Sequence, residues 1–383
     1  QGLRMVKLPD GACCIGYNVS ASIVPRSKDL GHCVTASSDA GSWPAGFVVV
    51  KLSHFSVNYA DVCIRWGLYE SANKYVGWPI VPGFDIAGEV EWIAPDVKGL
   101  AIGDKVFGYT LFGGYSSRVL VPLNQVRRIP AFLTPECSAA LTSVAVTALH
   151  AAAMGGHFPQ QLPVRNKHVL IHSAGGGVGS LLCVFSRDFG RKITAVVGSA
   201  EKVDAVQKLG VSQSDIFVKN SDELQTRYKH IQDDAGGFIT IFDGNGGKSL
   251  AEGFQMLAPG GTLVTYGMHT ILPSNARSIS PLTWVRMLFR MQGSPKIDPH
   301  DLITSNRSVR GFNLSFLASE EECAELYMDK ILTTVEAEQD LFKTSFPVKV
   351  YPIADLGKAH DFISSGKSVG KLVVGIKEGS KKL

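Results

Sequence analysis

A glycine-rich segment, residues 173–179, has the residue types and spacing best suited to binding a ligand. It reads Ser-Ala-Gly-Gly-Gly-Val-Gly, and Ala174, Gly176 and Gly179 take the three positions of a Gly-x-Gly-x-x-Gly motif. The middle glycine lets the backbone approach a pyrophosphate, and the last lets the following helix pack closely on the preceding strand. Free N–H groups at the start of that helix attract the anion. We therefore expect a dinucleotide site formed by Ala174, Gly176, Gly177, Val178 and Gly179.

The end of the next expected strand indicates which dinucleotide binds. A site for NAD has Asp or Glu about 20 residues after the glycine turn, where the carboxylate holds the ribose 2′-hydroxyl. Ser199 stands there instead, followed by Glu201 and Lys202. A hydroxyl and an ammonium suit a 2′-phosphate, so we expect NADPH. Lys202 could also be a solvated helix residue, and Glu201 weakens the positive potential.

The bulk composition excludes several classes of protein. The chain has 383 residues, 45% of them hydrophobic and 19% charged, as expected for a compact enzyme of two domains. The net charge is only +4, and no basic block stands beside aromatic residues, so we expect no nucleic-acid partner. No apolar run approaches the roughly 20 residues that cross a bilayer. The seven cysteines form no Cys-x-x-Cys pair, which suits a reducing, cytoplasmic location.

The elements that must position the glycine turn change in character along the chain. Short strands and turns fill residues 46–130, as in a β-rich domain. From position 144 apolar strands alternate with helices, which predicts a parallel sheet covered on both faces. The pattern after position 316 is like that of the first region again. We therefore predict an α/β protein with a Rossmann-type, doubly wound domain (144–316) inserted in a discontinuous β-rich domain (1–143 and 317–383).

Several strings at consistent spacing carry a resemblance to a known family. They are Val-Asn-Tyr-Ala-Asp at 57–61, Pro-Gly-Phe-Asp-Ile-Ala-Gly at 82–88, Gly-Asp-Lys-Val-Phe-Gly at 103–108, Leu-Val-Thr-Tyr-Gly-Met at 263–268 and Asn-Arg-Ser-Val-Arg-Gly-Phe at 306–312. With the glycine turn, they make the chain resemble the medium-chain dehydrogenase/reductase superfamily. Within it, the chain is similar to the zinc-free quinone oxidoreductase branch and its vesicle amine transport protein-like subgroup. The resemblance implies a GroES-like fold for the β-rich domain.

Zinc-dependent members of this superfamily have three features that this sequence lacks. They carry a catalytic Cys near the position of Asn58, Gly-His-Glu where this chain has Gly83-Phe84-Asp85, and a lobe with four cysteines. A zinc site needs three or four Cys, His or carboxylate ligands. We therefore expect no metal.

The resemblance also implies roles for individual residues. Asn58 would lie near the nicotinamide, and Tyr69 would point into the cleft as a proton donor, although it could merely line the pocket. Lys219 would replace a tyrosine that lies beside the adenine or the 2′-phosphate in several relatives and could serve the phosphate instead, although a solvated loop lysine is an alternative. The remaining cofactor contacts would come from Thr147, Gly244, Tyr266, Gly267, Gly370 and Lys371.

The resemblance implies transfer of hydride from NADPH to a small quinone or α,β-unsaturated carbonyl. Without a metal, the negative charge that develops on the substrate oxygen needs a hydrogen-bond donor or a proton. Delocalisation in quinones and enones lowers that demand, so they suit the site better than a simple alcohol. Tyr69 and Asn58 are the residues that we expect to act on the substrate.

Two segments indicate possible partners. Residues 309–316 are expected to form an edge strand, which in relatives pairs with its twin, so we expect a homodimer. An insert at 269–306 carries apolar residues beside Arg286 and Arg290. It could cover an apolar pocket, face a membrane or a second subunit, or be plain core. The alternative function is accordingly that of a cofactor-binding, peripheral membrane protein that handles lipid.

Overall fold

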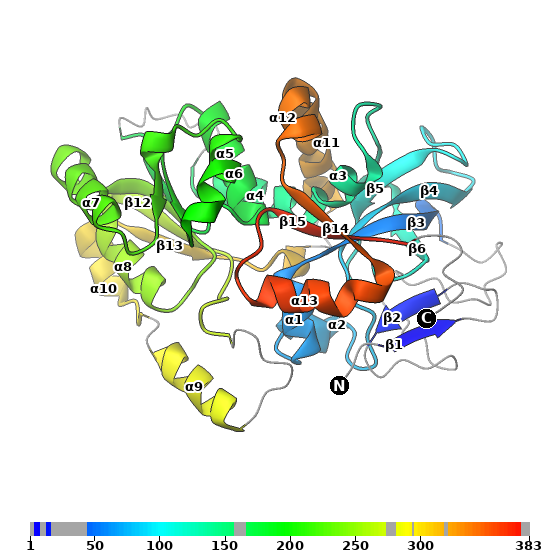
Figure 1. The fold of residues 1–383 in the computed structure, drawn as a ribbon, viewed down its shortest axis with the longest axis horizontal. Helices are drawn as coiled ribbons and strands as arrows, with labels where there is room; N and C mark the ends of the chain where they lie inside the picture. Colours follow the sequence, from blue (N-terminus) through cyan, green and yellow to red (C-terminus); the bar gives the residue numbers. More distant parts are fainter. Residues whose placement is uncertain are drawn as a thin grey trace.

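The computed structural model describes residues 4–7, 13–16, 44–156, 166–272, 281–292, 295–317 and 321–376. Two large sheets lie side by side, each with its own helices (Figure 1). A separate short hairpin, β1 (Arg4–Lys7) and β2 (Cys13–Gly16), belongs to the first region of the chain. Most of residues 1–43, which we assigned to the first domain, lie outside the described residues.

The first sheet is wholly parallel. Its spatial order is β10-β9-β8-β11-β12-β13, so the chain begins in the middle and reverses its direction of growth between β8 and β11. In such doubly wound sheets a ligand binds outside the carboxyl ends of the strands at that reversal. The strands are β8 (His168–Ile171), β9 (Lys192–Val197), β10 (Ile216–Val218), β11 (Phe238–Asp243), β12 (Leu257–Thr265) and β13 (Ser308–Gly311).

Alternating side chains of β8 explain why helices cover both faces. Val169 and Ile171 join the core that contains α4 and α5, whereas Leu170 joins the core formed with α7 and α8. All three are fully buried, as expected for a central parallel strand. The helices of this half are α4 (Thr142–Met154), α5 (Gly177–Asp188), α6 (Val203–Gln207), α7 (Asp222–Ala235), α8 (Lys248–Met256), α9 (Pro281–Gln292) and α10 (Pro299–Ser305).

The second sheet combines two distant parts of the chain. Strands from the first 130 residues form its centre, and the C-terminal strand β15 adds to β3 in antiparallel register, followed by β14. Its strands are β3 (Phe47–Val57), β4 (Asp85–Ile93), β5 (Lys105–Tyr109), β6 (Arg118–Pro122), β7 (Val126–Arg128), β14 (Val348–Pro352) and β15 (Lys371–Gly375). Its helices are α1 (Tyr59–Arg65), α2 (Glu70–Tyr75), α3 (Pro135–Ala139), α11 (Glu321–Ala337), α12 (Gln339–Thr344) and α13 (Leu356–Ser364).

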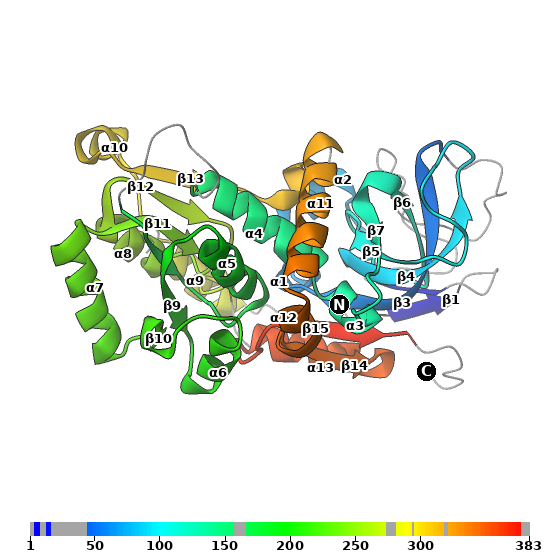
Figure 2. The same ribbon diagram turned by 90° about the horizontal axis from the view of Figure 1, so that it is seen from above.

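This architecture confirms the predicted fold class, a Rossmann-type parallel sheet beside a β-rich, GroES-like sheet that the chain leaves and re-enters. Seen from above, α4 and α11 lie between the two sheets (Figure 2). The exact domain boundaries at 143 and 316 stay a prediction.

The predicted edge strand at 309–316 is wrong in its second half. β13 pairs with β12 only over Ser308–Gly311, and residues 314–317 form a short 3-10 helix. The Asn313 side-chain oxygen accepts the backbone N–H of Ser315 at 3.0 Å and so turns the chain away from the sheet. The remaining strand is still the edge of the parallel sheet.

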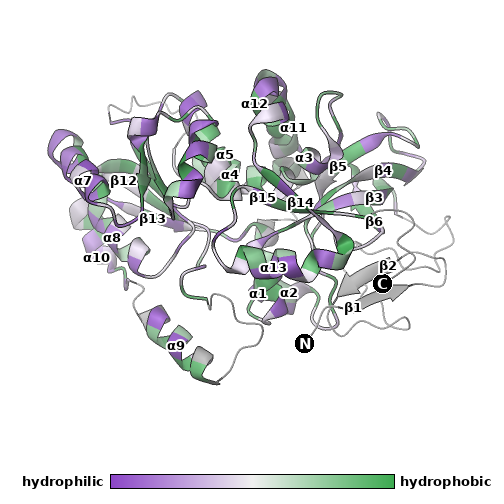
Figure 3. Ribbon diagram, viewed as in Figure 1, coloured by the Kyte–Doolittle hydropathy of each residue, from purple (hydrophilic) through white to green (hydrophobic). Residues whose placement is uncertain are grey.

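Helix α9 lies at the lower margin of the nucleotide-binding half in Figure 1, where the Arg290 side chain donates to the Leu272 carbonyl at 3.2 Å. Met287 is buried, but five other apolar side chains are 44–69% exposed, and the helix mixes green and purple in Figure 3. This part of the insert is therefore not plain core. Within the described residues, no helix is long and apolar enough to cross a membrane. The exposed side chains are those of Leu282, Trp284, Val285, Leu288 and Phe289.

Candidate active site

The glycine turn follows β8 at the reversal point of the parallel sheet. Ala174 is fully buried, and its N–H donates to the Val196 carbonyl of β9 at 2.9 Å. A Cβ added to Gly179 would lie 2.2 Å from the Ser173 carbonyl oxygen and 2.8 Å from the Ala174 Cα. Real Cβ atoms do not approach so closely, so only glycine lets α5 begin against the turn.

The first turn of α5 leaves donors free for an anion. Among the residues that the structure describes, the backbone N–H groups of Val178 and Gly179 have no hydrogen-bond partner, whereas that of Gly177 faces the Gly370 carbonyl in the bridge between Gly176 and Gly370. The first N–H groups of any helix lack an intrahelical partner, and the helix dipole adds a partial positive charge there. This arrangement fits a pyrophosphate, and the predicted residues are together in it.

The C-terminal segment of the GroES-like half lies against this turn. Gly370 donates its N–H to the Gly175 carbonyl at 2.9 Å and forms a bridge with Gly176. The Lys202 ammonium donates to the Gly366 carbonyl at 2.7 Å from the other side. Lys202, one of the side chains predicted for the 2′-phosphate, is thus a neighbour of the C-terminal segment that lies against the turn.

A buried ion pair fixes the next part of the site. The Lys371 ammonium lies 3.1 Å from the Asp85 carboxylate, and these side chains are 3% and 0% exposed. Lys371 also donates to Ser56 Oγ at 2.8 Å and to Asn58 Oδ1 at 2.5 Å. Ser143, in the first turn of α4, donates its N–H and its hydroxyl to Asp85. The network therefore joins β3, β4 and β15 to the first turn of α4.

The pKa values of two buried carboxyl groups near Asn58 are shifted in opposite directions. Burial would raise the pKa of Asp85, but the Lys371 ammonium and the hydroxyls of Ser143 and Ser56 outweigh it and hold that pKa below its ordinary value. Burial raises the pKa of Asp61 to about 7, even though Asp61 accepts the N–H of Asn58 at 2.7 Å and that of Gly83 at 2.9 Å. Asp61 thereby caps α1, the helix that begins after Asn58.

Tyr69 lies among aromatic rings, at the end of a loop before α2. Its ring meets those of Phe84 and Phe112 edge-on, at centroid distances of 6.0 and 6.3 Å. Its hydroxyl lies 3.1 Å from Asn313 Oδ1 and 2.9 Å from Ser315 Oγ, beyond the edge strand. Burial raises the pKa of Tyr69 to about 12. The hydroxyl is protonated and shares hydrogen bonds with the nucleotide-binding half.

Gly244 and Gly267 bring two strand ends into direct backbone contact. A Cβ on Gly267 would lie 2.5 Å from the Gly244 carbonyl oxygen, and one on Gly244 would lie 2.9 Å from the ring of Tyr266. His269 Nδ1 also lies 2.9 Å from that Gly244 carbonyl. These residues follow β11 and β12, at the carboxyl edge of the sheet where the glycine turn also lies.

Three further residues were predicted to contact the cofactor: Ser199, Lys219 and Thr147. Ser199 is half-buried at the end of β9, and Lys219 is exposed after β10. The Thr147 hydroxyl donates to the Ser143 carbonyl at 2.6 Å, one turn earlier in α4. Thr147 is therefore on the same side of α4 as the network around Asp85.

Sequence reasoning missed Ser56, Asp85 and Ser143 as members of the site. Asp85 was noted only as part of Gly83-Phe84-Asp85, which stands where zinc-dependent family members have Gly-His-Glu. The spacing from position 56 to position 371 offers no local signal, because the partners meet only through the sheet and α4. Within the described ranges, no group of three or more His, Cys, Asp or Glu side chains could hold a metal ion.

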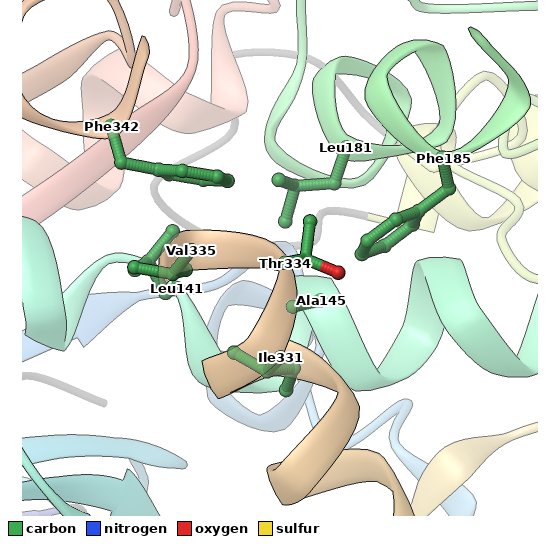
Figure 4. Close-up of a pocket in the computed structure, with 8 residues that line it drawn as sticks. All are labelled: Leu141, Ala145, Leu181, Phe185, Ile331, Thr334, Val335 and Phe342. Atoms are coloured by element: carbon green, nitrogen blue, oxygen red, sulfur yellow. The ribbon is translucent and has the colours of Figure 1, made fainter. Parts of the chain in front are cut away.

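A separate small pocket lies between α4, α5, α11 and α12 (Figure 4). Seven of its eight lining side chains are apolar, so it offers no set of partners for a phosphate or a ribose. It is a space within the helix packing. The lining residues are Leu141, Ala145, Leu181, Phe185, Ile331, Thr334, Val335 and Phe342.

Comparisons with known proteins match both halves. The family model "Alcohol dehydrogenase GroES-like domain" matches residues 44–131, and "Zinc-binding dehydrogenase" matches residues 177–332. The Synaptic vesicle membrane protein VAT-1 homolog of Danio rerio is 26% identical over 337 residues, which are 86% of this chain. The chain spans 64% of that relative's length.

Solved structures share the fold. Escherichia coli quinone oxidoreductase complexed with NADPH superposes with a TM-score of 0.68 at 19% identity, over 90% of this chain and 94% of that one. CurK enoyl reductase superposes with a TM-score of 0.67 at 21% identity, over 87% and 92%. The two family models and the VAT-1 relative place the chain in the medium-chain dehydrogenase/reductase superfamily, with similarity to VAT-1 homologues, and the solved structures share its fold.

Proposed function

We propose that the protein is an NADPH-dependent reductase of quinones or α,β-unsaturated carbonyl compounds. The observation that carries the proposal is the free first turn of α5, next to the half-buried Ser199 and the ammonium of Lys202. The N–H groups of Val178 and Gly179 would hold the pyrophosphate, with Gly177 beside them in the turn. Ser199, Lys202 and Lys219 would hold the 2′-phosphate, with no carboxylate at the Ser199 position to select NADH.

Other residues would place the nicotinamide end. Gly244, Tyr266 and Gly267 lie at the carboxyl edge of the sheet, where main chain without side-chain bulk permits close approach. The Gly370-Lys371 segment covers the turn from the GroES-like half, with Thr147 and Asn58 on its flank. When bound, NADPH supplies the hydride.

The protein itself has to stabilise the negative charge that develops on the substrate oxygen. Tyr69 is the candidate donor because its hydroxyl stays protonated and lies among the rings of Phe84 and Phe112, which suit a flat conjugated substrate. Its contacts with Asn313 and Ser315 hold the ring in place. The Asp85 carboxylate is paired with Lys371, and Phe84 stands where zinc-dependent family members have a histidine. We therefore propose catalysis without zinc.

Turnover tests this proposal. NADPH oxidation is followed at 340 nm with a panel of quinones, such as phenanthrenequinone, and of enones. We expect turnover with at least one member and a fall in kcat of roughly tenfold or more for Tyr69→Phe, as for loss of a proton donor. NADPH that binds but is never oxidised across the panel would remove the reductase function.

We further propose a homodimer in the cytoplasm, formed through β13. This strand is the open edge of the parallel sheet, and pairing with a second copy would satisfy its outward backbone groups. The domain boundaries at 143 and 316 belong to the same proposal.

A second candidate function, contact with a membrane surface, is favoured by α9. Its exposed apolar side chains, including Trp284 and Phe289, accompany Arg286 and Arg290, and residues 281–292 contain no Asp or Glu. An apolar helix with only positive charges suits an anionic bilayer surface. The VAT-1 relative is named a vesicle membrane protein.

Liposome sedimentation separates the two candidates. We expect vesicles of phosphatidylserine and phosphatidylcholine to bind the protein, and Trp284→Ser with Phe289→Ser to abolish binding without changing NADPH turnover. Ile102→Ser with Ile303→Ser is the matched control, because these side chains are 69% and 79% exposed elsewhere. Equal binding by both double variants would exclude α9 as the contact.

A further inference from the structure

The Lys371 ammonium donates all three of its protons in hydrogen bonds. Its three acceptors are Ser56 Oγ, Asn58 Oδ1 and Asp85 Oδ2, at 2.8, 2.5 and 3.1 Å. A lysine ammonium has three donors and no acceptor, so this set satisfies it completely. Burial of such a charge is costly unless it is paired and hydrogen-bonded in this way.

Lys371 determines which way the Asn58 carboxamide points. The oxygen and nitrogen of an amide are hard to distinguish by shape, but a donor-only neighbour settles the choice. The atom that faces Lys371 has to be Oδ1, and the Ser143 hydroxyl approaches the same oxygen at 3.2 Å. On the other side, Nδ2 donates to Asp85 at 2.9 Å. The ion pair therefore holds the amide from both ends.

One N–H of Asn58 has only a weak hydrogen-bond partner. The two Nδ2 hydrogens have Asp85 as one partner and only Ser56 Oγ at 3.4 Å as the other, which exceeds the usual length of an N–H···O bond. The Asn58 side chain is half-buried, whereas Lys371 and Asp85 are closed off from solvent. Ser143 is half-buried too, but its hydroxyl proton already goes to Asp85 at 2.6 Å, so the donor that this network can offer a ligand is the amide N–H of Asn58.

We propose that Lys371 is a positioning residue that locks Asn58 as a hydrogen-bond donor, never an acceptor, for a carbonyl oxygen of the bound ligand. The inference rests on the proposed function, which supplies two such oxygens, one in the nicotinamide carboxamide and one in the substrate. The Asp85 carboxylate serves as the counter-charge that lets the ammonium stay buried and holds the other end of the amide.

Cofactor analogues test the direction of this hydrogen bond in the unmodified protein. Calorimetry compares NADP⁺ with its 3-acetylpyridine analogue, which keeps the carbonyl oxygen but lacks the amide nitrogen, and with its thionicotinamide analogue, whose sulfur is a weak acceptor. If Asn58 donates to the carboxamide oxygen, the acetylpyridine analogue should bind with an affinity within about twofold of that of NADP⁺. The thionicotinamide analogue should bind roughly tenfold more weakly, the usual contribution of one neutral hydrogen bond. Asn58→Ala should remove that difference.

The reverse pattern, with only the acetylpyridine analogue weakened and Asn58→Ala restoring it, would show Asn58 as an acceptor and overturn the proposal. If both analogues bind like NADP⁺, the carbonyl is that of the substrate. Asn58→Ala then raises KM or lowers kcat roughly tenfold for a quinone while the NADPH affinity stays unchanged. If Asn58→Ala changes neither the cofactor nor the substrate parameters, the proposal fails.

A double-mutant cycle tests whether Lys371 acts through Asn58. Lys371→Met is combined with Asp85→Asn so that no unpaired charge stays buried. We expect this pair to weaken the affected parameter by about tenfold, and Asn58→Ala to do the same. The triple variant should be no worse than either, because the residues act as one unit.

If the effects of the Lys371→Met/Asp85→Asn pair and of Asn58→Ala multiply, the triple variant weakens the affected parameter nearly a hundredfold. Lys371 would then have only a general structural role. Asp104→Asn with Arg128→Met is the matched control, since it removes a surface ion pair of 2.7 Å and should change no binding parameter. If the Lys371 pair does not fold, the analogue comparison still decides the donor role of Asn58. Wild-type protein that binds no NADP⁺ or NADPH contradicts the proposed function itself, whereas binding with the wrong analogue pattern contradicts this inference alone.

Discussion

The backbone N–H of Gly370 donates a hydrogen bond of 2.9 Å to the carbonyl of Gly175, which ties the end of the GroES-like sheet to the glycine turn of the Rossmann sheet. The next residue, Lys371, begins β15 and turns its side chain into the network around Asp85. One short segment of chain therefore sets the glycine turn relative to Asn58. The site depends on both halves of the protein.

The tight start of α5 predicts a specific effect of one methyl group. Gly179→Ala places a Cβ 2.2 Å from the Ser173 carbonyl oxygen, so α5 must shift. We expect a loss of roughly 2 kcal/mol in the free energy of unfolding, as for overpacked sites, and at least tenfold weaker NADPH binding. Denaturant titration and fluorescence measure both. Gly198→Ala is the control because its Cβ meets nothing within 4 Å, and equal behaviour of the two variants would contradict the account.

The proposed 2′-phosphate contact predicts a change in cofactor preference. Lys202→Met should weaken NADPH binding roughly tenfold or more, the range for a hydrogen bond to a charged group, and leave NADH binding unchanged. Lys208→Met, an exposed lysine at the end of α6, should change neither. If Lys202→Met weakens both dinucleotides equally, its bond to Gly366 stabilises the fold and does not select the phosphate.

His360 predicts a pH dependence of stability. Burial, with a smaller effect of Arg65, lowers the pKa of His360 to about 3, and its Nε2 lies 2.9 Å from the Tyr115 hydroxyl. An unfolded histidine titrates near pH 6.5, so below that pH the unfolded chain takes up a proton that the folded chain does not. Stability is therefore present above about pH 6.5 and lost as the pH falls toward 3.

Urea unfolding at pH 7 and pH 5 measures this loss. The wild type should lose about 2 kcal/mol more than His360→Gln over that interval, from a slope that approaches 1.4 kcal/mol per pH unit. His300→Gln, in which an exposed histidine is replaced, should follow the wild type. An identical pH response in wild type and His360→Gln would show that His360 does not stay neutral.

The open edge of the parallel sheet predicts an interface variant. Phe312 donates its N–H to Thr265 of β12, and backbone groups alternate sides along a strand, so the N–H of Val309 faces away from β12. Val309→Pro removes that outward donor and should convert the proposed homodimer to a monomer in light scattering. Ser308→Ala should stay dimeric. A wild type that is monomeric at micromolar concentration would exclude the interface.

Local patterns were sufficient for the fold and the glycine turn. The apolar strand at 168–171 and the motif that follows it are contiguous, so consecutive residues determine their local structure. The sequence also predicted that the chain returns to the first sheet, because the β-rich pattern recurs at the C-terminus.

Long-range partners could not be predicted in the same way. Lys371 was expected near the cofactor, but its pairing with Asp85 joins residues 286 positions apart. The strand prediction at 309–316 failed because the Asn313 side chain accepts the backbone N–H of Ser315, a local bond that hydrophobic periodicity does not reveal. The Tyr69 contacts with Asn313 and Ser315 depend on that unpredicted turn.

The most direct test of the central claim is a fluorescence titration of the wild-type protein with NADPH and, separately, with NADH. The free first turn of α5 and the Ser199–Lys202 pair predict saturable NADPH binding that is at least tenfold tighter than NADH binding. Equal affinity for both would contradict the 2′-phosphate site, and no binding of either would contradict the dinucleotide site itself.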